Sequence, residues 1–354
     1  MSEIDILSFG ETMAMFVADH NGDLANVDHF HKRIAGADSN VAIGLSRLGF
    51  NVAWLSRVGD DSLGRFVIDT LKKEGIDCRN VAIDAAHPTG FQLKSRTDDG
   101  DDPMVEYFRR GSAASHLSPQ SIVPELLRAR HLHATGIPAA LSETARQMSL
   151  ELMTRMREAG RSVSFDPNLR PSLWANTQQM IIETNRLAAL ADWVLPGLSE
   201  GRLLTGFEDP ADIAAFYLDQ GAEAVAIKLG PHGAYYRTHL DEGFVAGVPV
   251  ETVIDTVGAG DGFAVGVISA LLENLSVADA VKRANWIGSR AVQSRGDMEG
   301  LPTRSEMSAE FETAFREQAR AHIRPGSSPH FVSDTDPNVG AGLLAKGPAQ
   351  SLNI

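Results

Sequence analysis

The chain has 354 residues, and its hydrophobic content of 43% is that of an ordinary globular protein. Its 46 acidic residues outnumber its 32 basic residues, and the formal net charge of −14 argues against binding to nucleic acid or anionic lipid. No segment approaches the roughly 18 consecutive apolar residues of a membrane span, and the acidic start is unlike a signal peptide. Cys78 is the single cysteine and is interpreted as a buried or incidental thiol, so no internal disulfide can form and a cytoplasmic location is expected.

The N-terminal third of the chain alternates between segments typical of strands and of helices. Apolar segments at 4–9 and 13–17 are predicted strands, and the segment up to residue 34 is expected to join a small sheet at the domain edge. Helices are predicted from residue 36 to Gly49 and from residue 59 to Gly75, with a strand at 52–58 between them. This βαβ spacing predicts a parallel sheet covered by helices. His29 and His31 have no third ligand nearby in the sequence, so we expect an exposed strand face rather than a metal site.

The rest of the chain continues this alternation. Two strands are expected within 89–108, around an acidic loop at 98–102 that lacks EF-hand spacing and is typical of a solvated hairpin tip. Further strands are predicted at 131–136, 162–166, 193–196, 224–229 and 234–237, and helices from residue 119, at 142–159, at 176–190, from residue 200 and at 277–293. His131 and His133 share a strand face and are interpreted as structural. Residues 311–322 are the last amphipathic segment, and the Gly and Pro content beyond residue 324 predicts one domain at 1–324 and a low-complexity tail at 325–354.

The stretch from residue 252 to residue 272 carries the strongest chemical signal. It is predicted to begin as the end of a strand at 252–254 and to continue as a helix from Phe263, with Gly258, Ala259 and Gly260 forming a turn between them. A helix start that follows a glycine turn offers unpaired amides and the positive end of the helix dipole to an anion. Asp261 is expected to open the helix, either as an ordinary cap or as a base for a hydroxyl that attacks phosphorus.

The longer string at 255–263, DTVGAGDGF, resembles the C-terminal signature of the PfkB (ribokinase-like) carbohydrate kinases. AGADSNVAIGLSRLG and SRVGDDSLGRF resemble the N-terminal signature of the same family, and the resemblance extends to about Pro302. It implies a ribokinase-like three-layer α/β/α fold with a mainly parallel central sheet and a small β-sheet lid from about 12–34 and 88–112. It also implies that Asp261 is the catalytic base and that the amides of Gly258, Ala259 and Gly260 form an anion hole. Because the lid is a common dimerisation surface in the family, a homo-oligomer is expected, as a dimer or larger.

The same resemblance implies a nucleotide site without a P-loop. No Walker sequence occurs in the chain. Lys228, Gly230 and Gly233 match the family's K-x-G-x-x-G turn along the nucleotide, although a plain β-hairpin is the alternative for such a turn alone. Asn285 matches a position near the adenine, and its alternative is a solvated helix residue. With Gly258 and Gly260, these residues are the expected contacts of ATP.

The resemblance also implies metal sites. Glu200 matches the Glu of the family's N-x-x-E motif, which orients Mg²⁺ through water, while Gly197 stands at the Asn position. Mg²⁺ retains several waters, so this departure is expected to move one water without abolishing metal use. Asp255, with the loop 294–296, matches positions at which many members bind a monovalent cation such as K⁺.

Two strings bear on the substrate. Tyr107 and Arg109 lie in Y-x-R-x-G-S-A, and Arg170 lies in D-x-N-x-R-x-x-L-W. Arginine can bind a carboxylate through two parallel hydrogen bonds, whereas either arginine taken singly would be interpreted as surface charge or as a partner of one of the abundant acids. The two strings together resemble the 2-keto-3-deoxygluconate kinase branch of the family, although Gln92 stands where that branch often has Tyr.

The resemblance assigns the sugar side to Gly36, Asn40, Gln92, Tyr107 and Arg109, with Arg170 beside the carboxylate or the transferred phosphate. The expected reaction is ATP-dependent phosphorylation of the terminal hydroxyl of a sugar acid, with 2-keto-3-deoxygluconate as the first candidate. Alternatives are a kinase for 5-keto-2-deoxygluconate, fructose or ribose, and a non-catalytic sugar-sensing protein on the same fold.

Overall fold

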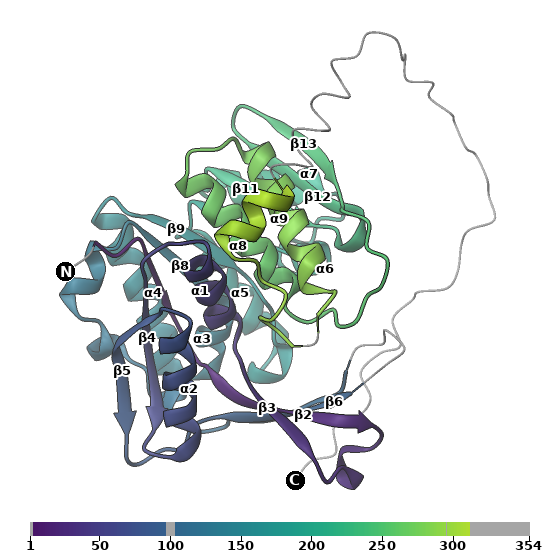
Figure 1. Cartoon of the computed structure of the whole chain (residues 1–354). Helices are drawn as coiled ribbons and strands as arrows, with labels where there is room; N and C mark the ends of the chain where they lie inside the picture. The colour runs from purple at the N-terminus through teal and green to yellow at the C-terminus, as the bar shows by residue number, and fades with distance from the viewer. Residues whose placement is uncertain (1–2, 97–102, 295, 312–354) are drawn as a thin grey trace. The chain divides into compact units, whose positions relative to one another are not determined.

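The computed structural model describes residues 3–96, 103–294 and 296–311. In this part of the chain the larger sheet has the order β13-β12-β11-β10-β9-β8-β1-β4-β5, parallel except at the β11–β12 and β12–β13 pairs (Figure 1). Its strands are β1 (Ile6–Phe9), β4 (Val52–Gly59), β5 (Asp77–Asp84), β8 (His131–Thr135), β9 (Ser162–Asp166), β10 (Trp193–Val194), β11 (Ala224–Lys228), β12 (Gly233–Thr238) and β13 (Glu242–Ala246). The predicted acidic hairpin tip, the tail at 325–354 and all but the first residue of the segment 311–322 lie outside the described residues.

A second, smaller sheet has the order β3-β2-β6-β7 and is called the small sheet below. Its strands are β2 (Met13–Asn21), β3 (Phe30–Ala35), β6 (Phe91–Arg96) and β7 (Val105–Phe108). β2 pairs in parallel with β6, while β3 and β7 are antiparallel to their neighbours. The two segments predicted to form a separate small sheet therefore pair as expected.

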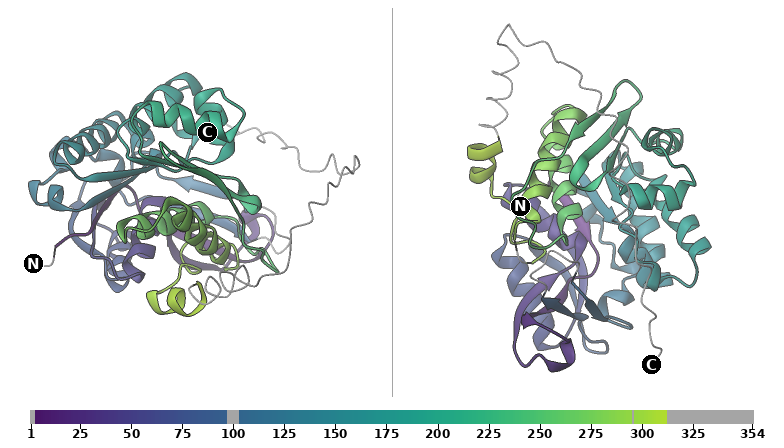
Figure 2. Two further views of the ribbon diagram at one scale, coloured as in Figure 1. Left: turned by 90° about the horizontal axis from the view of Figure 1, so that it is seen from above. Right: turned by 90° about the vertical axis from the view of Figure 1, so that its right-hand side faces the viewer.

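Helices cover both faces of the larger sheet, which confirms the predicted three-layer α/β/α architecture (Figure 2). One face carries α1 (Ala37–Arg47), α2 (Ser62–Lys73), α8 (Ala259–Leu272) and α9 (Val277–Ala291). The opposite face carries α3 (Gly136–Leu141), α4 (Glu143–Glu158), α5 (Thr177–Ala188), α6 (Leu198–Thr205) and α7 (Pro210–Asp219). Among the described residues, no helix has the length and apolar character needed to cross a bilayer.

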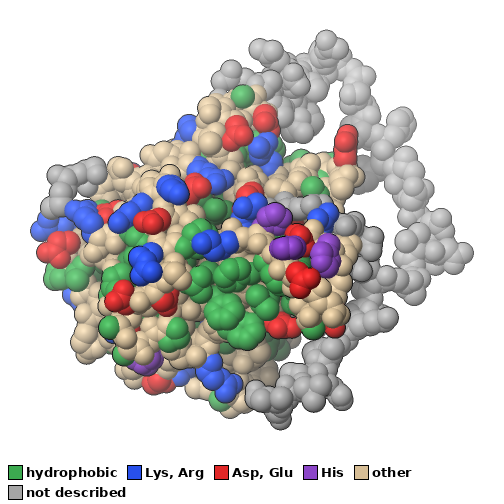
Figure 3. Space-filling view, turned by 60° about the horizontal axis from the view of Figure 1, so that its bottom comes forward, with side chains coloured by type: hydrophobic (Ala, Val, Ile, Leu, Met, Phe, Trp, Pro, Cys, Tyr) green, Lys and Arg blue, Asp and Glu red, His purple; other side chains and the backbone are tan. Residues whose placement is uncertain are grey.

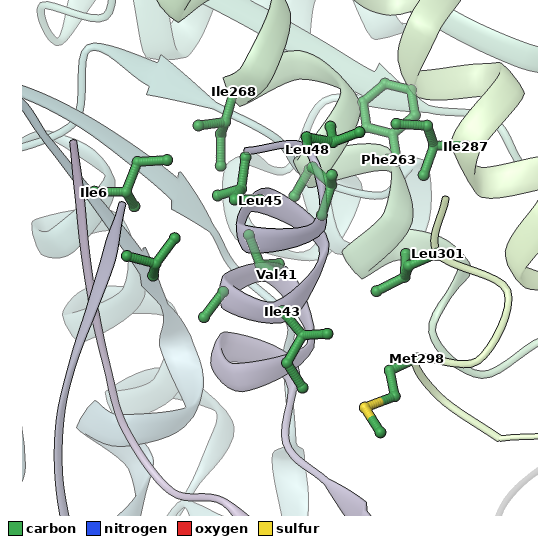
Figure 4. Packing of buried hydrophobic residues seen from close by; sticks show 14 of the residues in the cluster. Ile6, Val41, Ile43, Leu45, Leu48, Phe263, Ile268, Ile287, Met298 and Leu301 are labelled. Atoms are coloured by element: carbon green, nitrogen blue, oxygen red, sulfur yellow. The ribbon is translucent and has the colours of Figure 1, made fainter. Parts of the chain in front are cut away.

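The core around α8 is what places the functional turn. Figure 4 shows Leu45 of α1 and Leu48, which follows this helix, beside Phe263 and Ile268 of α8. Burying each such side chain contributes roughly 1.5–3 kcal/mol. α8 is buried from Asp261 to Ala270, as expected for a helix that is apolar on all sides. A Cβ at Gly266 would lie 2.3 Å from Cα of Ala284, so glycine is needed where α8 and α9 meet.

The start of α8 differs from the prediction. The helix begins at Ala259 rather than Phe263, and its N-cap is Gly258 in the left-handed region at φ 86°. Asp261 therefore lies in the first helical turn and is not the cap. The predicted strand at 252–254 is also wrong. Instead, the backbone amides of Ile254 and Asp255 donate to the carbonyl of Val292 at 2.8 and 3.2 Å, and none of the described strands pairs with this segment.

Other differences concern short elements. The helix predicted from residue 119 is two 3₁₀ segments, Pro119–Ser121 and Pro124–Arg128, because the second proline lacks the amide that a continuous helix needs. The strands β5 and β13 and the helices α3 and α7 were not predicted from the sequence. Cys78 on β5 is buried as expected, and burial raises the pKa of its thiol to about 11. His31 on β3 is exposed, and His131 and His133 are buried and hydrogen-bonded to Ser162 and Ser164.

Candidate active site

A cavity of about 400 Å³ lies between the ends of the central strands, the start of α8 and the small sheet. Ligands of open α/β sheets bind at the carboxyl ends of the strands, where this cavity lies. Most of the residues that the sequence assigned to the site line it, although they come from distant parts of the chain: Gly36, Asn40, Gln92, Tyr107, Arg109, Arg170, Glu200, Lys228, Gly258, Gly260 and Asp261.

Asp261 is the buried carboxylate at the centre of this cavity. Its side chain accepts a hydrogen bond from Asn40 Nδ2 at 2.8 Å on one oxygen and from Asn168 Nδ2 at 3.5 Å on the other. Burial raises the pKa of Asp261 to about 7, and the carboxylates of Asp166 and Asp297 act in the same direction. A carboxylate with a pKa near neutrality is matched to the task of accepting a proton from an alcohol.

The glycine turn, residues 258–260, places the start of α8 against the same cavity. A Cβ at Gly258 would lie 2.4 Å from the carbonyl oxygen of Asp297, so both the positive φ and the space require glycine. Among the described side chains none caps the start of α8, while the amide of Ala259 reaches only the carbonyl of Thr256 at 3.4 Å. The first amides and the positive end of the helix dipole are therefore available to an anion beside Asp261.

Two cations face the glycine turn across the cavity. Lys228, at the end of β11, donates to Asp166 Oδ2 at 2.6 Å, and burial raises the pKa of that carboxyl while Lys228 opposes the shift. Arg170 donates to the carbonyl of Leu169 at 2.9 Å, which holds its guanidinium within the loop after β9. Both positive charges lie where a phosphorylated ligand that reaches the glycine turn would pass.

Glu200 holds the loop after β9 and the start of its own helix. One oxygen accepts the amide of Leu169 at 2.7 Å and the other accepts the amide of Gly197 at 2.8 Å. Both oxygens therefore have protein partners, so Glu200 suits contact with a hydrated ion through water better than direct coordination. The absence of an Asn side chain at Gly197 leaves this arrangement intact.

The part of the cavity to which the resemblance assigns the sugar is built by β6, β7 and the loop before α1. Gln92 and Tyr107 are opposite each other in the β6–β7 pair. Arg109 is 7% exposed and pairs with the buried Glu11 through Nε at 2.7 Å and Nη2 at 2.6 Å. A Cβ at Gly36 would lie 2.4 Å from the carbonyl oxygen of Glu11, so the backbone can pass this close only with glycine at this position. Glu11 thus contacts Arg109 through its side chain and Gly36 through its backbone.

Comparison with known proteins identifies the family. The family model described as pfkB family carbohydrate kinase matches residues 3–304. The chain belongs to the pfkB carbohydrate kinase family. It is 52% identical to a 2-dehydro-3-deoxygluconokinase of Bacillus subtilis (strain 168) over 309 residues, which cover 87% of this chain and 95% of the relative.

Solved structures of pfkB kinases show the same fold. A PfkB protein from Polaromonas sp. JS666 has a TM-score of 0.81 and 54% identity, covering 86% of this chain and 99% of that chain. A double mutant of fructokinase from Vibrio cholerae O395, bound to fructose, ADP and potassium ion, has a TM-score of 0.76 and 29% identity, covering 87% and 98% of the two chains. The ribokinase-like fold expected from the sequence is therefore confirmed.

Some residues assigned from the pfkB resemblance do not line the cavity. Asn285 donates to the carbonyls of Val245 and Ala246 at 3.0 and 3.1 Å, which ties α9 to the end of β13. Gly230 and Gly233 form the expected turn between β11 and β12, both with positive φ, but lie outside this cavity, as does Ala259. Asp255 lines a neighbouring, smaller pocket instead. Their nucleotide and cation roles stay predictions.

The kinase site also contains acidic and basic residues that the sequence did not single out. Asp38 is buried in α1 and accepts the amide and the hydroxyl of Thr135, each at 3.0 Å, while burial raises its pKa to about 8. Glu11, Lys94, Asp166 and Asp297 also line the cavity. The alternation of β6 offered one signal, because Lys94 follows Gln92 by two residues and so shares its face.

Proposed function

We propose that this carbohydrate kinase transfers the γ-phosphoryl group of ATP to the terminal hydroxyl of 2-keto-3-deoxygluconate. The observation that carries the proposal is a buried carboxylate, Asp261, with a pKa of about 7 beside an uncapped glycine turn in a single cavity. The 52% identity to the Bacillus subtilis 2-dehydro-3-deoxygluconokinase supports this choice of substrate.

In the proposed reaction Asp261 accepts the hydroxyl proton as the alcohol oxygen forms its bond to the γ-phosphorus and the bond to ADP breaks. The amides of Gly258, Ala259 and Gly260 stabilise the charge on the transferred group, and Arg170 and Lys228 neutralise the phosphates. Glu200, through water, would hold Mg²⁺, which supplies positive charge to the β- and γ-phosphates. The small sheet closes over the sugar and excludes water that would otherwise hydrolyse ATP.

A sugar acid fits the sugar side better than a neutral hexose. Glu11 occupies Nε and Nη2 of Arg109, and the remaining N–H groups of a guanidinium can still bind a carboxylate. Gln92 and Tyr107 supply hydrogen bonds for the hydroxyls. A neutral sugar could accept only hydrogen bonds from Arg109, whereas the carboxylate of a sugar acid could also pair with its positive charge.

A coupled assay of ADP release tests the proposal with 2-keto-3-deoxygluconate, 5-keto-2-deoxygluconate, gluconate, fructose and ribose. We expect kcat/KM for 2-keto-3-deoxygluconate to exceed the neutral sugars by about 100-fold, because charge pairing in a buried site discriminates strongly. Mass spectrometry of the product should locate the new phosphate on the terminal hydroxyl. An equal kcat/KM for fructose would contradict the proposal that the substrate is a sugar acid. The absence of ADP release with every sugar would favour a sugar-sensing protein.

We further propose that the kinase acts in the cytoplasm, with no nucleic-acid or membrane partner.

We also propose that two copies associate through the outer face of the small sheet. On that face the rings of Phe91 and Phe108 stack with centroids 4.6 Å apart, and Phe16 meets Phe91 edge to face at 6.1 Å. Figure 3 shows hydrophobic side chains gathered on this side of the molecule. Such an exposed aromatic patch is typical of a protein–protein contact.

A further inference from the structure

Lys94 is a buried lysine whose charge is fixed between two carboxylates. It lies on β6 of the small sheet with its side chain 3% exposed. Its Nζ donates to Asp255 Oδ2 at 2.6 Å and to Asp297 Oδ1 at 3.0 Å. Burial opposes the charge, but the two carboxylates outweigh it and raise the pKa of Lys94 above its usual value. The side chain is therefore an ammonium ion held in one place.

The two carboxylates belong to segments that frame the glycine turn. Asp255 begins the string that ends at Asp261, and its other oxygen, Oδ1, accepts the amide of Val257 at 3.0 Å. Asp297 places its backbone carbonyl against Gly258, where a Cβ would lie 2.4 Å from the oxygen. Lys94 thus joins a strand of the small sheet to both segments that support the start of α8.

This arrangement does not fit an added monovalent cation at Asp255. Both oxygens of its carboxylate already have partners, one of them an ammonium ion. A second cation at the same oxygen would lie within a few ångströms of Nζ, and the repulsion between them would be weakly screened in the buried interior. Among the described residues, Arg170 also lowers the pKa of Asp297 and lines the same cavity.

We propose that the Lys94 ammonium replaces a bound monovalent cation, so that this kinase reaches full activity without K⁺. Lys94 is then a positioning residue. Its ammonium group offsets the negative charges of Asp255 and Asp297 and so holds the glycine turn in place. Because Gln92 on the same strand face lines the sugar cavity, β6 also links the sugar side to the phosphate side. The proposal rests on the proposed kinase function.

The first test compares the unmodified enzyme in potassium, sodium and tetramethylammonium chloride at equal ionic strength, with 2-keto-3-deoxygluconate and ATP. We expect kcat to vary by less than about twofold, because the internal ammonium carries the required charge. A K⁺-specific increase of tenfold or more, roughly the effect of losing one charge-assisted hydrogen bond, would overturn the proposal.

The second test replaces the ammonium with a neutral side chain in Lys94→Met. We expect kcat to fall by about 100-fold, and K⁺ or ethylammonium ion to restore it by about tenfold, because a small cation can then enter between the two carboxylates. A merely structural lysine would give no such rescue. Lys73→Met, at an exposed lysine in the last turn of α2 outside the cavity, is the control and should retain normal activity with no response to either cation.

A third measurement separates this proposal from the proposed function. The melting temperature of the ligand-free protein is measured in the same three salts for the unmodified chain and for Lys94→Met. A K⁺-specific rise only in the variant supports the replacement, whereas a K⁺-specific rise in the unmodified chain refutes it. If Lys94→Met does not fold, the double variant Lys94→Met, Asp255→Asn removes one positive and one negative charge together. The salt series on the unmodified chain still tests the proposal in that case. Absence of turnover with every sugar would refute only the kinase function.

Discussion

Asp261 has to be buried and still be able to lose its proton near neutral pH. Burial and the neighbouring carboxylates of Asp166 and Asp297 raise its pKa, while Asn40 and Lys228 stabilise its charged form. The balance leaves the pKa at about 7 rather than far above it. Removal of the ionisable group should therefore affect chemistry far more than binding.

The substitution Asp261→Asn should lower kcat by about 1,000-fold and leave the affinity for ATP nearly unchanged, because the amide cannot accept the hydroxyl proton. Steady-state ADP release and calorimetric titration of ATP measure the two effects. Asp192→Asn is the matched control, since Asp192 is another partly buried carboxylate with a raised pKa but lies outside the cavity. Normal turnover of Asp261→Asn would remove this residue from the role of base.

The pH dependence of kcat/KM should report the same carboxylate. Below its raised pKa Asp261 carries a proton and cannot accept another, so kcat/KM should rise about tenfold per pH unit and level off above about pH 7. The midpoint belongs to the coupled cluster of acids around Asp261 rather than to one group. If the rise in kcat/KM instead levelled off near pH 4, Asp261 would titrate as an ordinary exposed acid.

At the scale of elements, the sequence predicted the order of strands and helices well where periodicity was strong. It placed β9 at its observed bounds and α4 and α9 within two residues, because β9 is a short apolar segment and the two helices have apolar residues at helical spacing. It misplaced the start of α8, because the helix continues into glycine residues whose composition is typical of a turn. The motif nevertheless singled out Gly258, Gly260 and Asp261, which line the cavity.

The pairs that hold the site together could not be predicted in this way. Lys94 with Asp255, and Arg109 with Glu11, join residues far apart in the sequence, so their contacts arise only when the small sheet folds over the larger one. Arg109 was expected to face the substrate, and Glu11 could not be identified from the sequence as its partner. Sequence motifs identified which residues gather at the cavity but not how their charges are balanced.

The Glu11–Arg109 pair should couple the small sheet to stability. Glu11→Gln or Arg109→Gln should each lower the free energy of unfolding by about 3 kcal/mol, because each leaves the partner buried and unpaired. The loss of unfolding free energy in the double variant should be smaller than the sum of the two single losses by at least about 1 kcal/mol. The reason is that the effects of substitutions at residues in direct contact are not additive. Urea unfolding followed by circular dichroism measures all three.

The exposed pair of Arg202 with Glu208 is the control for this experiment. Its atoms are 2.9 Å apart, close to the distances of the buried pair, but the two side chains are 46% and 82% exposed. Arg202→Gln should therefore change the free energy of unfolding by less than about 1 kcal/mol. Additive losses at Glu11 and Arg109 would show that the two residues do not act as a pair.

At the scale of the whole molecule, the small sheet separates two environments. Its inner face carries the polar and charged residues of the cavity, and its outer face carries the aromatic stack of Phe16, Phe91 and Phe108. A chain with a net charge of −14 repels copies of itself at long range, so association requires a local apolar surface.

Phe108→Asp should dissociate the proposed dimer, because it places a charge in the apolar contact. Light scattering coupled to size-exclusion chromatography would show the mass fall from two chains to one. Phe207→Asp is the matched control, since Phe207 is 45% exposed and Phe108 47%, but Phe207 lies away from the small sheet. A mass that does not change in Phe108→Asp would exclude this face as the interface.

The single thiol of the chain has a practical consequence. Cys78 is buried and has a pKa of about 11, so only about one molecule in 10,000 presents a reactive thiolate at neutral pH. A cysteine introduced at the exposed Met104 beside the small sheet, and another at Leu240 in the β12–β13 turn, would react with maleimide dyes in preference to the native thiol. Energy transfer between two such dyes would then test whether the small sheet moves during turnover, without any prior removal of the native cysteine.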